Sequence, residues 1–346
     1  MVTGKALSVL GSGFMVNHRV ITAALLLLAL TGCSNITEHE MAFKAGLHII
    51  SSQDFSIIKT ITDMAGARSL LIYPGNVFVA STEGIIYRID SETQEYVDEY
   101  QVAAASPAGF SDMVFCNLKN TAYLIGPLGK ILEISLPDCT VIDEFAICQS
   151  PVRLALGPGS QHLFVADGPS SRVYQVAIDD NEAKGSVHIY YNINCIESSQ
   201  YPDTIVVGTS EDMNIVEVLD SGSLRLTRPK LLQYYCFSAV AAIPDDTAFV
   251  AVVGSNVCLL DVFVPDEFPP PPFFSGQIHI EGDVHFVAIG NDWQHAYVLS
   301  YLGDNTSRLI SYNYRFFSID NEMDIPGYPL DLQVSGGGVI YALTTE

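Results

Sequence analysis

The chain has 346 residues, of which 49% are hydrophobic and 10% aromatic, and its formal net charge is −23. So acidic a chain repels nucleic-acid phosphates and anionic lipid headgroups, and no nucleic-acid partner is expected. The apolar content suffices for a large core, but no apolar stretch reaches the roughly 20 residues that a membrane-spanning helix needs.

The N-terminal region contains the longest apolar run, Val20–Leu30, which has 11 residues and no charge. The run follows Arg19 and precedes two small residues and Cys33. It is too short to cross a bilayer but suits the apolar region of a secretory signal. Met15 begins a compact signal of its own, so either Met1 or Met15 is the start. Cys33 is then a core thiol, half of a disulfide or a site of lipid attachment.

The sequence LALTGC at residues 28–33 resembles the lipobox of bacterial lipoproteins, in which Leu and two small residues precede the modified cysteine. The resemblance implies that residues 1–32 are a signal peptide and that Cys33 becomes the first residue. Its sulfur and its amine then carry acyl chains such as palmitate, and several such chains hold a protein on a membrane durably. Ser34, where retained lipoproteins have Asp, implies the outer membrane of a bacterial envelope, on its periplasmic or outer surface.

A mature chain that begins at Cys33 has a charge of about −25, because residues 1–32 hold two cations, Lys5 and Arg19, and no acid. Residues 33–45 form the expected tether, and residues 46–346 the folded domain. Six further cysteines are expected to be structural thiols or disulfides, and six allow 15 pairings. They are Cys116, Cys139, Cys148, Cys195, Cys236 and Cys258. None stands in a CxxC pair, so no metal site and no cofactor is expected.

The strongest pattern in the chain is a repeat of short apolar segments that carry an aromatic residue. The segments are residues 76–81, 121–126, 162–167, 203–209, 247–253, 295–301 and 339–345. Aligned on the third apolar position, they bring into register Phe78, Tyr123, Phe164, Ile205, Phe249, Tyr297 and Tyr341, at intervals of 45, 41, 41, 44, 48 and 44 residues. Turns rich in Gly, Asn, Asp and Pro separate the strands of each unit. Units of this length with four strands predict an all-β, seven-bladed β-propeller.

The two ends of the domain complement each other. The last repeat stops at Glu346 after its second strand, and residues 46–62 match the second half of a repeat, as do residues 84–102. We therefore expect residues 329–346 and 46–62 to form the seventh blade together. This pairing closes the ring and removes exposed sheet edges, so a monomer is expected.

Residues 163–187, LFVADGPSSRVYQVAIDDNEAKGSV, resemble the repeats of the YVTN and NHL propeller families. The resemblance lies in an aromatic-Val-Ala-Asp strand, a short polar turn and a Val-Tyr-x-Val-x-Ile-Asp strand, and residues 78–92 share it more loosely. The repeats do not follow the WD40 pattern, since Trp293 is the only Trp. The resemblance implies a binding module, a scaffold or an enzyme, because these families include all three and the fold alone does not choose.

The first strand of each blade is expected to line a central channel, and a polar residue lies 8 to 12 positions before each aligned residue. These residues are Arg68, Asp112, Arg153, Glu197, Ser238, His285 and Asp331. One interpretation is a pocket for a charged or zwitterionic small molecule at the channel mouth, with His285 or Glu197 as acid or base. The interpretation we favour is an ion-pair network around a water-filled channel.

Two further features suggest weaker sites. Loop acids expected on the same face could bind calcium together, although no segment has the DxDxDG spacing of a compact calcium loop and solvated turn acids are favoured. These acids are Glu83, Asp167, Asp212 and Asp304. Residues 264–276, VPDEFPPPPFFSG, predict a stiff polyproline II loop that either docks a partner or packs on its own blade.

The mature chain contains no nucleophile elbow, phosphate-binding glycine loop or HExxH motif, so no catalytic residue is assigned. We expect a lipid-anchored, non-enzymatic binding or scaffold module of the cell envelope, with another envelope protein as its partner. The alternative is a lactonase-like hydrolase or lyase with its site at the channel mouth.

Overall fold

The computed structural model describes residues 44–106, 109–199, 204–211, 213–218, 223–228, 236–243, 248–261 and 274–345. All of them lie in one compact unit, Met41–Glu346. Their regular structure is β-strand except for two single-turn 3-10 helices, Pro127–Gly129 and Pro158–Ser160. None of the helices in this part of the chain has the length and apolar character needed to cross a membrane.

The described strands form seven four-stranded antiparallel sheets. The first three in chain order contain β3 (Ala67–Tyr73), β4 (Asn76–Ser81), β5 (Ile85–Asp90) and β6 (Tyr96–Gln101); β7 (Met113–Cys116), β8 (Thr121–Ile125), β9 (Ile131–Ser135) and β10 (Val141–Phe145); and β11 (Pro151–Leu156), β12 (His162–Asp167), β13 (Arg172–Ala177) and β14 (Glu182–His188). The next three contain β15 (Ile193–Ser199), β16 (Thr204–Thr209), β17 (Met213–Val218) and β18 (Leu224–Arg228); β19 (Phe237–Ala242), β20 (Ala248–Val253), β21 (Asn256–Asp261) and β22 (Phe274–His279); and β23 (Asp283–Ile289), β24 (His295–Gly303), β25 (Thr306–Asn313) and β26 (Ser318–Pro326).

The remaining sheet is built from both ends of the described chain. Its strands are β27 (Pro329–Val334), β28 (Val339–Thr345), β1 (Lys44–Ser51) and β2 (Ile57–Ala65). β1 pairs with β28 over seven residues, from Ala45 opposite Thr345 to Ser51 opposite Val339. These are the segments that the sequence places in one sheet, except that β1 begins two residues before position 46 and β2 ends three residues after position 62. The last two residues of the expected tether therefore belong to β1.

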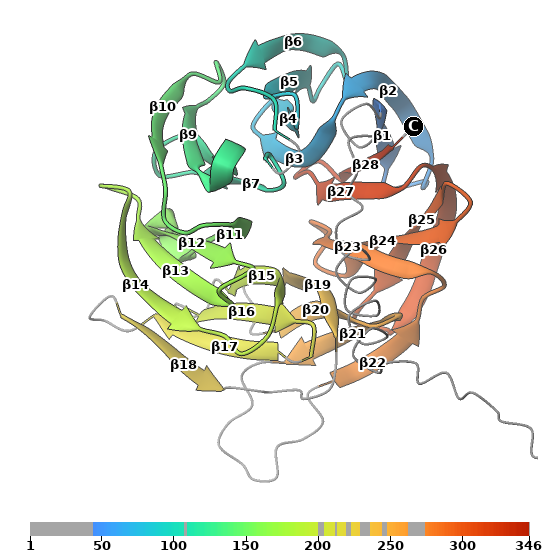
Figure 1. The fold of residues 1–346 in the computed structure, drawn as a ribbon. Helices are drawn as coiled ribbons and strands as arrows, with labels where there is room; N and C mark the ends of the chain where they lie inside the picture. The colour runs from blue at the N-terminus through green and yellow to red at the C-terminus, as the bar shows by residue number, and fades with distance from the viewer. Residues whose placement is uncertain are drawn as a thin grey trace, which may run out of the picture. The chain divides into compact units, whose positions relative to one another are not determined.

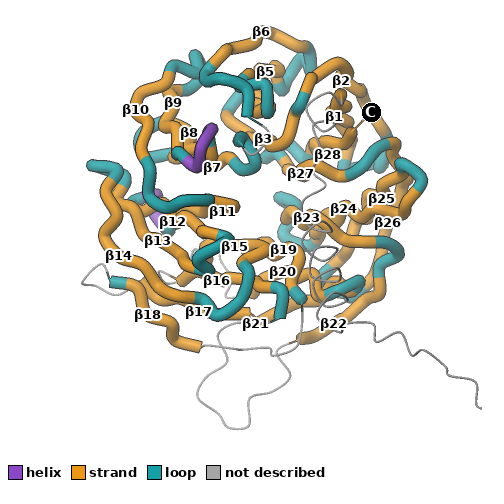
Figure 2. Tube along the Cα trace, viewed as in Figure 1, coloured by secondary structure: helices purple, strands orange, loops and turns teal. Residues whose placement is uncertain are grey.

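The sheets follow one another around a common centre, with the first strand of each sheet innermost (Figure 1). The inner strands β3, β7, β11, β15, β19, β23 and β27 each contact the inner strand of the next sheet, and β27 contacts β3. Strands and short loops make up almost all of the described trace (Figure 2). The chain is therefore an all-β propeller with almost no helix, as the repeat predicts.

The core lies between neighbouring sheets and contains the seven aligned residues. Each of them lies on the second strand of its sheet and is at most 3% exposed. Phe78 on β4, for example, packs with Met113 and Ala122 of the following sheet. Phe164 on β12 packs in the same way with Ile205. A single unit cannot bury this face alone, which explains why the aromatic position recurs with the period of the repeat.

The remaining predictions concern the cysteines, the N-terminal region and two loop features. The six cysteines after Cys33 are all free thiols in the described part of the chain, and only Cys236 is exposed. The predicted signal peptide, Cys33, Asp212 and most of the proline-rich segment (residues 264–273) lie outside the described residues.

Candidate functional site

The seven polar candidates lie near the starts of the inner strands, but they do not form a single layer. Six of the seven described inner strands have a one-residue irregularity in their pairing with the second strand. Such a bulge shifts the side chains that follow it by one position. Arg68, Ser238 and His285 are the unpaired residues at these bulges.

The other four candidates lie further along their strands. Arg153 and Asp331 come directly after a bulge. Asp112 occupies the corresponding position before β7, where its carbonyl accepts a hydrogen bond from Ile125 N at 3.1 Å. Glu197 lies two residues beyond the residue that follows the bulge of β15. Arg153, Asp331 and Asp112 thus form one layer and Glu197 a deeper one.

Asp331 and Asp112 join neighbouring inner strands in the same way. The Oδ2 atom of Asp331 accepts a hydrogen bond from the backbone N–H of Leu70 on β3 at 2.6 Å, and its Oδ1 atom accepts one from Leu332 N at 2.7 Å. Asp112 accepts corresponding bonds from Leu154 N on β11 at 2.7 Å and from Met113 N at 3.0 Å. Each carboxyl group therefore connects its own sheet to the inner strand of a neighbouring sheet. This contact stabilises the fold.

The inner-strand acids have raised pKa values, because protein atoms surround them and disfavour the charged form. Burial raises the pKa of Asp331 to about 7, although its two backbone N–H donors oppose the shift. Burial also raises the pKa of Asp112, while the nearby charge of Arg153 lowers it. Arg153, which lies in the same layer as Asp112 and Asp331, donates to Val152 O at 2.9 Å.

Glu197 differs from the other two acids because no described residue donates a hydrogen bond to its carboxyl group. Burial, and then the neighbouring charge of Asp112, raises the pKa of Glu197 to about 8. The side chain is partly reached by solvent. A carboxyl group with a pKa near neutrality can give or take a proton, so Glu197 is the candidate best suited to acid–base chemistry.

His285 lies in an aromatic cluster apart from these acids. Its Nδ1 atom is 3.4 Å from the hydroxyl of Tyr328, and the two rings meet edge to face with centroids 4.9 Å apart. Tyr301 packs on the other side of Tyr328, also at 4.9 Å. Burial lowers the pKa of His285, with a weaker opposing effect of Asp283, so its ring is neutral at pH 7. No contact joins His285 to Glu197 in the described structure.

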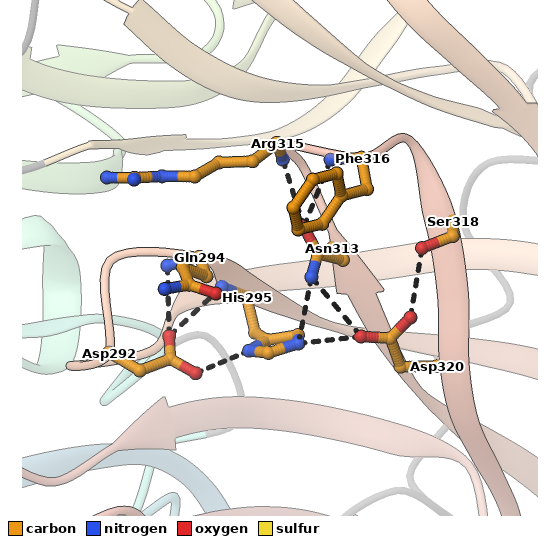
Figure 3. Close-up of polar contacts among 8 residues, drawn as sticks. All are labelled: Asp292, Gln294, His295, Asn313, Arg315, Phe316, Ser318 and Asp320. Atoms are coloured by element: carbon orange, nitrogen blue, oxygen red, sulfur yellow. Dashed lines mark hydrogen bonds and ion pairs between the residues drawn. The ribbon is translucent and has the colours of Figure 1, made fainter.

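A second histidine, His295, is not among the candidates predicted from the sequence. Unlike His285, it contacts two carboxyl groups directly. It is the first residue of β24, and its ring lies between Asp292 and Asp320 (Figure 3). Its Nδ1 contacts Asp292, and its Nε2 is 2.8 Å from Asp320 Oδ2. Burial lowers the pKa of His295, but the two carboxylates outweigh it and raise the pKa overall. When the ring is protonated, both nitrogens donate to these carboxylates, and the ring then has no lone pair for base catalysis or metal binding.

The three described loop acids that were weighed as calcium ligands, Glu83, Asp167 and Asp304, are not gathered into a metal site. Among the described residues, no group of three or more His, Cys, Asp or Glu side chains is placed to hold a metal ion. The Oδ2 atom of Asp167 instead accepts a hydrogen bond from Ser170 Oγ at 2.5 Å within its own turn.

Comparison with known proteins supports the fold. No protein-family model and no curated protein sequence matches the chain. Among solved structures, the chain is similar to a hydrazine synthase of Kuenenia stuttgartiensis, with a TM-score of 0.63 and 12% identity over 81% of this chain and 95% of that one. It is also similar to U3-55K, with a TM-score of 0.61 and 12% identity over 84% and 89% of the two chains. The WD40 repeats of RRP9 match with a TM-score of 0.62 and 11% identity over 86% and 98%. At such identities the likeness is one of β-propeller fold alone.

Proposed function

We propose that this protein is a non-enzymatic binding or scaffold module of a bacterial cell envelope. The observation that carries the proposal is the use of Asp112 and Asp331, whose carboxyl groups bond to backbone N–H groups of neighbouring strands rather than facing one another across a site. The propeller fold, which also occurs in WD40-repeat proteins, supports the same role because it presents many loops on a rigid support.

Lipid attachment at Cys33 is the second part of the proposal. It is supported by the apolar run, the small residues before the cysteine and the basic flank. The anchor places the protein at the outer membrane, on the periplasmic or outer surface, with another envelope protein as its partner. A net charge of −23 argues against a nucleic acid in that role.

The finer architecture is also part of the proposal. We take the seven sheets as seven blades of a closed, monomeric ring of the YVTN or NHL type. The pairing of β1 with β28 and the contact of β27 with β3 support closure. The strand-turn-strand sequence of residues 163–187, which folds as β12 and β13, supports the repeat type.

Intact mass spectrometry of the protein, extracted gently from native membranes, tests the proposal. We expect acyl mass on the chain and a protein partner in stoichiometric amount. A chain without acyl mass would refute the anchor. A chain that carries no macromolecular partner and converts a small molecule would refute the scaffold role.

A hydrolase or lyase of the lactonase type is the second candidate, and the raised pKa of Glu197 favours it. For this candidate, Glu197→Gln should abolish turnover while the protein stays folded. His285→Ala supplies the matched comparison, since His285 lies in a separate cluster and its loss should leave an activity based on Glu197 intact.

A further inference from the structure

A pocket of about 600 Å³ lies between two segments that are far from the inner-strand acids in sequence. One wall is the loop that follows β10, and the other is the turn between β12 and β13. The side chains that matter for binding are Ile147, Cys148, Gln149, Asp167, Ser170 and Tyr174. This volume lies in the range typical of small-molecule sites.

Asp167 is the only carboxylic acid among the residues that line the pocket, and it is 3% exposed. Its Oδ2 atom accepts the bond from Ser170 Oγ, but its Oδ1 atom accepts no hydrogen bond from any described residue. The neighbouring cation Arg172 donates instead to Ser186 Oγ at 3.1 Å. A buried carboxylate oxygen without a donor is unfavourable, so this atom is suited to a donor supplied by a ligand.

The other lining groups indicate the chemistry of that ligand. Ser170 already donates its hydroxyl proton to Asp167, so its oxygen is left as an acceptor. Burial, and then the charge of Asp167, raises the pKa of the Cys148 thiol to about 12, which keeps it uncharged. Ile147 and Tyr174 add apolar and aromatic surface suited to a hydrocarbon stem. A chain with a net charge of −23 also attracts cations to its surface.

We propose that this pocket binds an organic cation with N–H donors, in which a guanidinium or ammonium group bonds to Asp167 and an apolar stem lies against Ile147 and Tyr174. Such a group occurs on a free small amine and on an arginine or lysine side chain of a protein. The pocket is separate from the inner-strand acids, so the ligand binds whether or not the protein is a lipid-anchored scaffold.

The test uses the full-length protein and two probes of equal shape, butylguanidinium and its neutral analogue butylurea. Saturation-transfer NMR titrations in about 0.15 M salt give both affinities, at an ionic strength that screens distant surface charges. We expect butylguanidinium to bind about tenfold or more tightly than butylurea, because a hydrogen bond between two charged groups is stronger than one from a neutral donor. Equal affinity for the two probes, or no saturable binding of either, would overturn the proposal.

Three variants localise the binding. Asp167→Asn should remove the preference for the cation, whereas Glu92→Gln, which removes an exposed acid from another sheet, should preserve it. Ala146→Trp, at an exposed lining position, should fill the pocket and weaken both probes without disturbing the core. If Asp167→Asn fails to fold, the affinities of the two probes for the wild type and for Ala146→Trp still show whether the cation binds in this pocket. A preference that survives Asp167→Asn or Ala146→Trp would place the cation elsewhere.

A blocked tripeptide, acetyl-Ala-Arg-Ala-amide, distinguishes the two sources of the cation. Tighter binding of the tripeptide than of butylguanidinium would indicate a side chain of a protein partner. Binding of butylguanidinium alone would indicate a free small cation.

Discussion

The buried carboxyl group of Glu197 leads to an unusual prediction, in which a substitution inside the protein increases its stability. Replacing Glu197 with Gln should stabilise the protein at alkaline pH, because the amide keeps the size of the side chain and removes its charge. The folded pKa of Glu197 is about 8, against an ordinary value of 4.5 for a glutamate side chain. The folded state therefore binds more protons than the unfolded state between these values, and the stability that this group contributes falls as the pH rises through that interval.

The magnitude follows from the width of the interval. A difference of one between the folded and the unfolded pKa corresponds to about 1.4 kcal/mol, so the full cost of ionising Glu197 in the folded protein is on the order of 4 to 5 kcal/mol. Solvent partly reaches the side chain, and screening reduces this figure to about 2 to 3 kcal/mol. The cost develops between about pH 4.5, where the unfolded carboxyl group ionises, and about pH 8, where the folded carboxyl group loses its proton.

Urea unfolding of the wild type and of Glu197→Gln at pH 5 and pH 9 measures this effect. We expect the advantage of the variant to grow by about 2 kcal/mol between the two pH values. Glu92→Gln is the matched control, because Glu92 is exposed, and it should show no such change. An advantage that is equal at both pH values would refute the assignment of a raised pKa to Glu197.

Three further predictions concern stability and anchoring. Asp331→Ala should lower the free energy of unfolding by about 2 to 4 kcal/mol in urea titrations, because it leaves two backbone N–H groups, including that of buried Leu70, without acceptors; Asp331→Asn, which keeps one acceptor, should cost less. His295→Gln should destabilise the protein at pH 6 and have less effect at pH 9, since the raised pKa of His295 gives stability that is present below pH 6.5 and is lost as the pH rises through the folded pKa. Cys33→Ser should lose all acyl mass and leave the membrane fraction on cell fractionation.

The strands could be predicted from the sequence because their signal is local. Residues 76–81, 162–167 and 339–345 coincide with β4, β12 and β28, since each segment is a short apolar run with β-branched or aromatic residues that lies next to turn-forming residues. The recurring aromatic position could be predicted as core for the same reason. The pairing of the two chain ends in one sheet could be predicted because the last repeat lacks its third and fourth strands and the N-terminal segment matches them, not because of a local motif.

The layering of the inner-strand residues could not be predicted in the same way. A bulge adds one residue without a characteristic residue type, so a fixed distance before the aligned residue does not select one layer. The contact of His285 with Tyr328 joins two sheets and depends on their packing. The spacing of Asp292 and His295 at a turn did offer a local signal, but its second acid, Asp320, comes from β26.

The polar side chains of the inner strands differ in whether they form a hydrogen bond with the backbone of a neighbouring inner strand. Asp331 bonds to β3 and Asp112 to β11, and two residues of β15 do the same with neutral groups: Ser198 donates to Leu156 O on β11, and Asn194 donates to Phe237 O on β19 at 2.9 Å. These four need no ligand to explain them. Glu197 lies among them with a raised pKa and no hydrogen bond from a described residue, although burial of such a group is costly. Because none of the described residues donates a hydrogen bond to its carboxyl group, Glu197 is the inner-strand residue whose substitution best separates a structural role from a functional one.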